Sequence, residues 1–124
     1  MELLFYSGKN QQSRERVLNI IRGLVPEKKI GNYTTVENLC NRLRQFRDDK
    51  MLAILMAATQ EELVDVVLIH DLLVDIPIIL VLPNREKETI SKGTKLHPRF
   101  ISYMDSDFSD IQAVLEKMVV RLNS

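Results

Sequence analysis

Two short segments, residues 7–10 and 57–60, lie at the ends of apolar runs and precede stretches with helical periodicity. Backbone N–H groups at such a strand-to-helix junction can bind an anion such as a phosphate. The first segment (SGKN) has one glycine and lacks the GxxxxGK(S/T) pattern, which favours a simple turn. Together the two segments still define one hypothesis for function, a binding site for a small anion or a nucleotide.

Other residue types that carry chemistry lack partners at the spacings that catalysis or metal binding requires. His70 and His97 have no Cys, Asp or Glu at a recognised ligand spacing. Asp105, Asp107 and Asp110 are close in sequence, and capping of a helix explains two of them without a cation. Four hydroxyl residues could act as nucleophiles, but none has a candidate base in a sequence context such as GxSxG: Ser13, Thr59, Ser91 and Ser102. The sequence therefore predicts no enzyme, no metal and no cofactor.

The composition is that of an ordinary water-soluble domain. The chain has 124 residues, of which 45% are hydrophobic and 27% are charged, so a single domain spanning residues 1–124 is expected. Lys plus Arg and Asp plus Glu number 17 each, so no global field attracts nucleic acid or anionic lipid. Basic residues outnumber acidic ones in residues 1–50, but they are spread over two helical stretches without aromatic interleaving. Nucleic acid is therefore not an expected partner.

Cysteine content and hydropathy bear on where the protein works. Cys40 is the only cysteine, which fits a reducing cytoplasm. The longest apolar run, residues 76–83, is far shorter than the ~20 residues that a membrane-spanning helix needs. These features predict a cytoplasmic protein that is not inserted in a membrane.

Strand-like apolar runs alternate five times with stretches of helical periodicity. The runs cover residues 3–6, 29–33, 51–58, 78–82 and 100–104. The third and fourth are apolar throughout, which is typical of parallel strands covered on both faces. Right-handed crossovers then predict an α/β fold, a single doubly wound (βα)5 parallel sheet with the flavodoxin-like strand order 2-1-3-4-5. The ends of the first and third strands would flank the topological switch point, where such folds keep their sites.

Several signals mark where the helices begin. Thr34-x-x-Glu37 and Thr59-x-x-Glu62 have the spacing of a capping box, in which hydroxyl and carboxylate each accept the other residue's backbone N–H. The fourth helix, from about residue 86 to residue 96, contains Gly93 and is expected to be the weakest. The last helix is predicted to begin just after residues 106 and 107.

The element order and two junctions resemble the receiver domain of bacterial two-component response regulators, over essentially the whole chain. Residues 75–79 (DIPII) are similar to the receivers' entry into strand four, and residues 107–110 (DFSD) to the junction before their last helix. A receiver transfers a phosphoryl group onto an Asp at the end of strand three, and it uses Mg²⁺ held by acids at the end of strand one. Clustered carboxylates serve this chemistry because Mg²⁺ takes hard oxygen ligands.

The residues that would form this phosphorylation site are absent. The family's metal ligands, phosphoacceptor, hydroxyl and cation correspond here to Ser7 and Gly8, Met56 and Ala57, Leu82, and Tyr103 or, with a small shift, Ser106. The hollow at the ends of the central strands is therefore expected to have lost its negative charge. Without that charge, and without a nucleophilic oxygen, it would neither retain magnesium nor accept phosphate.

The resemblance thus implies a pseudo-receiver, a non-catalytic signalling or regulatory module that contacts a protein partner or a second copy of itself. Receivers commonly use their fourth helix, fifth strand and fifth helix for such contacts. The candidate residues on that surface are Lys92, Lys95, Arg99, Tyr103 and Arg121. Solvation of the basic residues and inward packing of Tyr103 are the alternatives. A flavodoxin-like binder of a small anion or nucleotide at residues 7–10 and 57–60 stays open as the other function.

Overall fold

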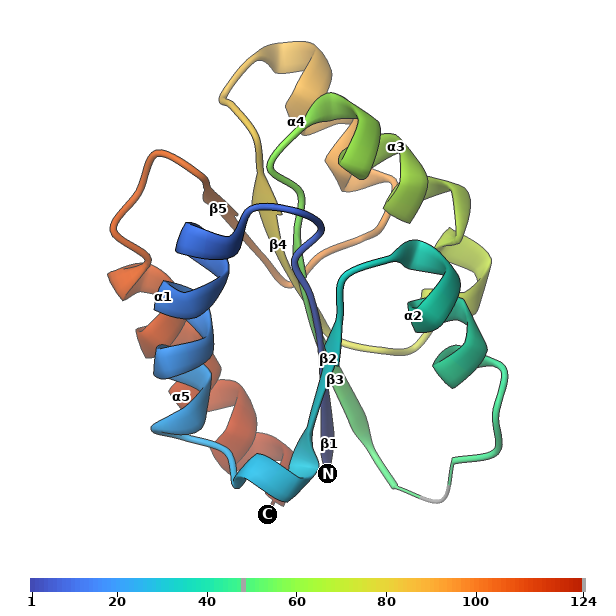
Figure 1. Cartoon of the computed structure of the whole chain (residues 1–124), viewed down its shortest axis with the longest axis vertical. Coiled ribbons are helices and arrows are strands. Elements are labelled where there is room, and N and C mark those ends of the chain that lie inside the picture. Colours follow the sequence, from blue (N-terminus) through green and yellow to red (C-terminus); the bar gives the residue numbers. More distant parts are fainter. Residues whose placement is uncertain (48, 124) are drawn as a thin grey trace.

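The computed structural model describes residues 1–47 and 49–123, and within them five parallel strands alternate with five α-helices (Figure 1). The strands are β1 (Glu2–Tyr6), β2 (Ile30–Tyr33), β3 (Met51–Met56), β4 (Ile78–Leu82) and β5 (Phe100–Tyr103). The α-helices are α1 (Gln11–Arg22), α2 (Val36–Leu43), α3 (Gln60–Leu68), α4 (Lys87–Thr94) and α5 (Ser109–Asn123). Two short 3₁₀ helices, η1 (Glu27–Lys29) and η2 (His70–Leu73), precede β2 and β4.

The strand order is β2-β1-β3-β4-β5, which confirms the predicted doubly wound (βα)5 topology. Helices α1 and α5 cover one face of the sheet, and α2, α3 and α4 cover the other (Figure 1). Strands β2 and β5 are therefore the outer strands, and each is four residues long. The chain crosses to opposite sides after β1 and β3, so the loops that follow these two strands meet at the switch point.

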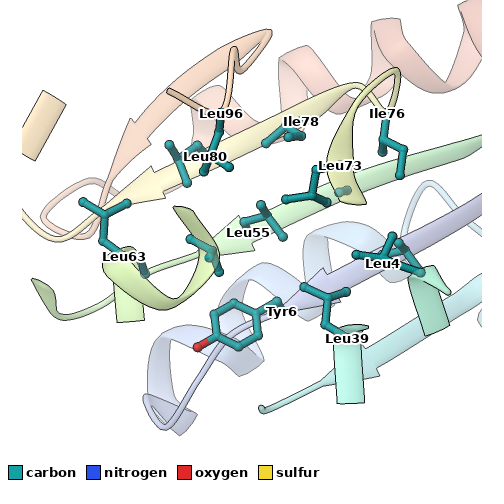
Figure 2. Close-up of a cluster of buried hydrophobic side chains, with 14 of the residues drawn as sticks. Leu4, Tyr6, Leu39, Leu55, Leu63, Leu73, Ile76, Ile78, Leu80 and Leu96 are labelled. Atoms are coloured by element: carbon teal, nitrogen blue, oxygen red, sulfur yellow. The ribbon is translucent and has the colours of Figure 1, made fainter. Parts of the chain in front are cut away.

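Strand β3 is buried at all six positions, as its unbroken apolar run predicts. Its side chains alternate between two cores. Leu52 and Ile54 pack toward α1 and α5, whereas Ala53 and Leu55 pack toward α2, α3 and α4. Figure 2 shows the second of these cores, where Leu55 lies among side chains from the neighbouring strands and helices. The central strands are thus apolar on both faces, and the two switch-point loops lie at the C-terminal edge of the sheet.

The predicted capping box at Thr34 and Glu37 is wrong by one residue. The N-cap of α2 is Thr35, whose hydroxyl accepts a hydrogen bond from the Asn38 N–H at 3.2 Å. Thr34 and Thr35 both have a hydroxyl group that could cap the helix. The helix begins after Thr35, where its buried residues, which include Leu39, face the sheet.

Other element ends also differ from the predictions. Strand β3 stops at Met56 rather than at residue 58. Helix α4 is shorter than predicted, and α5 begins at Ser109. The α5 start follows from Asp107, because its carboxylate accepts hydrogen bonds from both the N–H and the hydroxyl of Ser109.

Gly93 in α4 has a packing role that the sequence pattern alone does not reveal. A Cβ atom at this position would lie 2.9 Å from Cδ2 of Leu80 and 3.0 Å from Cδ2 of Leu82. These distances are shorter than ordinary van der Waals contact between carbon atoms. The glycine therefore allows α4 to pack directly on β4, at the known cost of glycine in a helix.

Candidate functional site

The switch-point loops are joined by one side chain, Glu62 in the first turn of α3. Its Oε1 accepts a hydrogen bond from the Ala58 N–H at 2.9 Å, and its Oε2 accepts one from the Lys9 N–H at 3.1 Å. Lys9 follows β1 and Ala58 follows β3, so a single carboxylate bridges the two loops across the switch point. The N–H groups that would bind a foreign anion there already bind an anion that belongs to the chain.

Two predictions about this place need correction. The hollow has not lost its negative charge, because the Glu62 carboxylate occupies it. The capping box at Thr59 is half right: the Thr59 hydroxyl accepts the Glu62 N–H at 3.1 Å, but the carboxylate binds Ala58 and Lys9 instead of the Thr59 N–H. The approach of the β1–α1 loop offers this carboxylate a second donor, which a local capping box would leave unused.

Gly8 lies in close contact with the Glu62 carboxylate. Its backbone has φ +57°, a left-handed conformation that glycine adopts without a steric penalty. A Cβ atom at Gly8 would overlap Oε2 of Glu62. Glycine is thus required both by the turn and by the close approach of the Glu62 side chain.

The other positions that the sequence predicts at a degenerate phosphorylation site are buried and offer no anionic ligand. Ser7 is fully buried, and its hydroxyl has no hydrogen-bond partner within the described residues. Met56, Ala57 and Leu82 are also fully buried. Met56 packs toward α1 and α5, while Ala57 and Leu82 face the opposite core. The structure therefore brings Ser7 and Gly8 close to the end of β3, where Met56 and Ala57 present apolar side chains.

Tyr103 lies apart from this cluster, at the end of the outer strand β5. The guanidinium of Arg85 stacks over its ring at 4.1 Å from the ring centroid. Arg85 also donates two hydrogen bonds to Asp105, at 2.9 and 3.2 Å. The hydrogen bond from Arg85 lowers the pKa of the Asp105 carboxyl. Tyr103 is half-buried and packs on the core beside α4, and the sequence pattern gives no signal for its partner Arg85.

A second hydroxyl at this edge has a carboxylate partner that the sequence pattern does not predict. Ser102 is fully buried, and its Oγ donates to the carboxylate of Asp110, with distances of 3.0 and 3.1 Å to the two oxygens. Asp110 lies in the first turn of α5, so the contact fastens α5 to β5. The pair lacks a histidine or another base beside it in the described chain, and it is best understood as a structural contact.

The candidate interface residues lie along two helices and the outer strand. Lys92 is half-buried in α4, whereas Lys95, Arg99 and Arg121 are exposed. Arg99 lines one cavity together with Lys95 and a smaller one together with Arg121. These three basic residues therefore follow one another across the N-terminal end of β5, while Tyr103 lies at its other end.

Beside the switch point, a cleft of about 330 Å³ opens between the N-termini of α2 and α3. Its walls include Tyr6, Lys9, Thr35, Glu62 and Asp65. Burial raises the pKa of Tyr6 to about 12, and the negative charges of Glu62 and Asp65 add to the effect. The phenol is thus held in its neutral form next to two carboxylates.

The Tyr6 environment gives a testable pH dependence. The folded pKa of about 12 exceeds the unfolded value of 10.0, so the neutral phenol stabilises the fold fully below pH 10. This contribution is lost as the pH rises from 10 toward 12. Urea unfolding at a series of alkaline pH values should show a weaker loss in Tyr6→Phe than in the wild type. Parallel losses in the two proteins would contradict the assignment.

Neither a metal cluster nor a membrane span is found in the described residues. Within residues 1–47 and 49–123, no group of three or more His, Cys, Asp or Glu side chains could hold a metal ion. None of the helices in those ranges is both long enough and apolar enough to cross a bilayer. No protein-family model and no curated protein matches the chain.

Proposed function

We propose that this chain is a non-catalytic, receiver-like regulatory module that acts through protein–protein contact and is not phosphorylated on aspartate. The observation that carries the proposal is the Glu62 carboxylate held by the Lys9 and Ala58 N–H groups. This negative charge lies at the ends of β1 and β3, where an incoming phosphoryl group and its Mg²⁺ would have to bind. Two anions in such proximity repel each other, and no second carboxylate at the end of β1 is present to share a cation.

The residue types around Glu62 support the same proposal. Ala57 offers a methyl group at the end of β3, and Leu82 offers an aliphatic side chain at the end of β4. Neither has an oxygen that could attack a phosphorus atom or hydrogen-bond a phosphoryl group. A scaffold of this topology without its chemistry is suited to present surfaces to a partner.

The same contact weighs against a small-anion or nucleotide site at residues 7–10 and 57–60. A free phosphate would have to displace the Glu62 carboxylate from both N–H groups before it could bind there. Displacement would also leave the carboxylate near the new anion, since Glu62 is in the first turn of α3. The protein-contact function is therefore the better supported of the two.

For the contact surface, we infer the face formed by α4, β5 and α5. Lys95, Arg99 and Arg121 form a basic edge there, and Arg85 covers Tyr103 at the far end of β5. A homodimer through this face is one form of the proposal. A cytoplasmic location also belongs to it, because a chain whose only cysteine is the buried Cys40 fits a reducing compartment.

Treatment with acetyl phosphate, or with beryllofluoride, in the presence of Mg²⁺ tests the proposal. Intact-mass spectrometry should show no added phosphoryl group, and the amide NMR signals of Gly8, Lys9 and Ala58 should not shift. An active receiver domain treated in parallel supplies the positive control. A stoichiometric phosphoprotein, or beryllofluoride shifts centred on these three amides, would overturn the proposal. Light scattering on the untreated protein then distinguishes a homodimer from a monomer that awaits another partner.

A further inference from the structure

The loops that precede β4 and β5 enclose a cavity of about 410 Å³ at the N-terminal edge of the sheet, opposite to the switch point. Buried apolar side chains line it, among them Leu73, Ile76 and Leu96. Each loop turns through a non-glycine residue with a left-handed backbone, Asp75 with φ 69° and His97 with φ 50°. Both of these residues line the cavity, so the two sharp turns shape its entrance.

A second hollow, of about 620 Å³, adjoins the first along α3 and α4. The two share His70, Lys95 and His97, and together we call them the α3–α4 groove. Aliphatic side chains at the groove are unusually exposed: Leu68 is 73% accessible and Val74 is 59% accessible. Helices α3 and α4 lie side by side, and near their N-termini Gln60 donates a 2.7 Å hydrogen bond to the buried hydroxyl of Thr89.

Three of the four basic side chains that line the α3–α4 groove have no partner in the described part of the chain. The side chains of Lys95, His97 and Arg99 make no hydrogen bond or ion pair within residues 1–47 and 49–123. His70 is bound locally, with Nδ1 3.0 Å from the Val67 carbonyl oxygen and Nε2 3.1 Å from Asp71. Asp75 is the one carboxylate in the lining of the groove. An anionic ligand would thus meet unpaired donors at the rim.

We propose that the α3–α4 groove binds an amphipathic segment of a protein partner that carries aliphatic and acidic side chains. Its aliphatic side chains would cover Leu68 and Val74, and its carboxylates would pair with Lys95 and Arg99. A small inorganic anion would leave the exposed aliphatic groups uncovered, whereas a helix laid between two helices uses both features. The inference rests on the proposed function, because Lys95 and Arg99 belong to the contact surface described there.

Fluorescence anisotropy with a labelled peptide tests this inference. The probe is a helix-forming peptide of about four turns with Leu on one face and Glu beside it. It should bind saturably, and the amide shifts should centre on residues 67–75 and 94–99. The double variant Lys95→Glu/Arg99→Glu should weaken binding about tenfold or more. Lys28→Glu makes half of that charge change, −2 instead of −4, at η1 beside the other outer strand, and should change the affinity less than about twofold.

Matched variants separate the apolar contribution and guard against misfolding. Leu68→Ser should weaken binding about fivefold, whereas Phe46→Ser, which alters another exposed apolar side chain, should not. If the glutamate variants melt early, Lys95→Gln/Arg99→Gln replaces them with the same expectation. Absent binding, equal losses in Lys28→Glu, or shifts centred on α5 would each overturn the inference. These outcomes leave the phosphorylation test untouched, so failure of the groove is distinguishable from failure of the regulatory proposal.

Discussion

Replacing Phe108 by alanine is expected to lower the free energy of unfolding by about 3–5 kcal/mol. The Phe108 ring is fully buried in the core between the sheet and helices α1 and α5. The Arg16 guanidinium lies over the ring, 5.0 Å from its centroid, and Arg16 also donates to the Asp107 carbonyl oxygen at 3.3 Å. Truncation would therefore leave a cavity at the junction where β5 turns into α5. Urea unfolding monitored by circular dichroism measures the loss.

A glycine at position 108 should be tolerated no worse than alanine. Phe108 has φ 64°, and a left-handed conformation costs an alanine about 1–2 kcal/mol that glycine avoids. Phe5 is an equally buried phenylalanine in the ordinary strand β1 and supplies the control. There the glycine variant should be less stable than the alanine variant by about 0.5–1 kcal/mol. The same order of stability at both positions would contradict the role assigned to the Phe108 backbone.

The second large effect is expected for Gly8→Ala, which should cost about 3 kcal/mol. Part of this cost comes from the left-handed backbone, with φ +57°, and part from the overlap of the new Cβ with Glu62. The Glu62 carboxylate is at the end of a flexible side chain and can move aside. It would then lose its hydrogen bonds to Lys9 and Ala58, and these N–H groups would lose an anionic acceptor.

A double-mutant cycle isolates the two parts. Glu62→Ala alone should cost about 2 kcal/mol, because two charge-assisted hydrogen bonds are lost from a partly exposed site. In that background, Gly8→Ala should cost only the backbone penalty of about 1–2 kcal/mol. Gly23→Ala is the control, since its φ is −73° and the nearest atom to a new Cβ is 3.4 Å away. Strict additivity of Gly8→Ala and Glu62→Ala would show that the carboxylate does not bridge the loops.

The sheet could be predicted well because buried strands appear in the sequence as local apolar runs. Strand β4 has the predicted limits, since an apolar run between Pro77 and Pro83 cannot be a helix of ordinary length. The sequence does not define the end of β3 as sharply, because Ala57 and Ala58 are apolar but lie beyond the strand. Ala57 still donates to the Val81 carbonyl oxygen, whereas the Ala58 N–H turns toward Glu62. Apolar character alone does not separate these two hydrogen-bonding states.

The candidate site could be predicted only in part, because its main contact joins residues far apart in the chain. The spacing of Thr59 and Glu62 indicates a local cap, and the hydroxyl half of that cap is present. The Glu62 carboxylate accepts a hydrogen bond from the N–H of Lys9, 53 residues away, which comes within reach only in the folded sheet. The pairs of Arg85 with Tyr103 and of Ser102 with Asp110 likewise depend on how the loops meet at one edge of the sheet.

The short outer strands of the sheet limit how copies of this chain can aggregate. Unpaired backbone groups on an outer strand are the usual template for intermolecular β-sheet growth. Here both ends of the strand order are only four residues long, and β2 contains Gly31 and Asn32, which are poor strand formers. Growth of fibrils from native molecules through the outer strands β2 and β5 is therefore disfavoured.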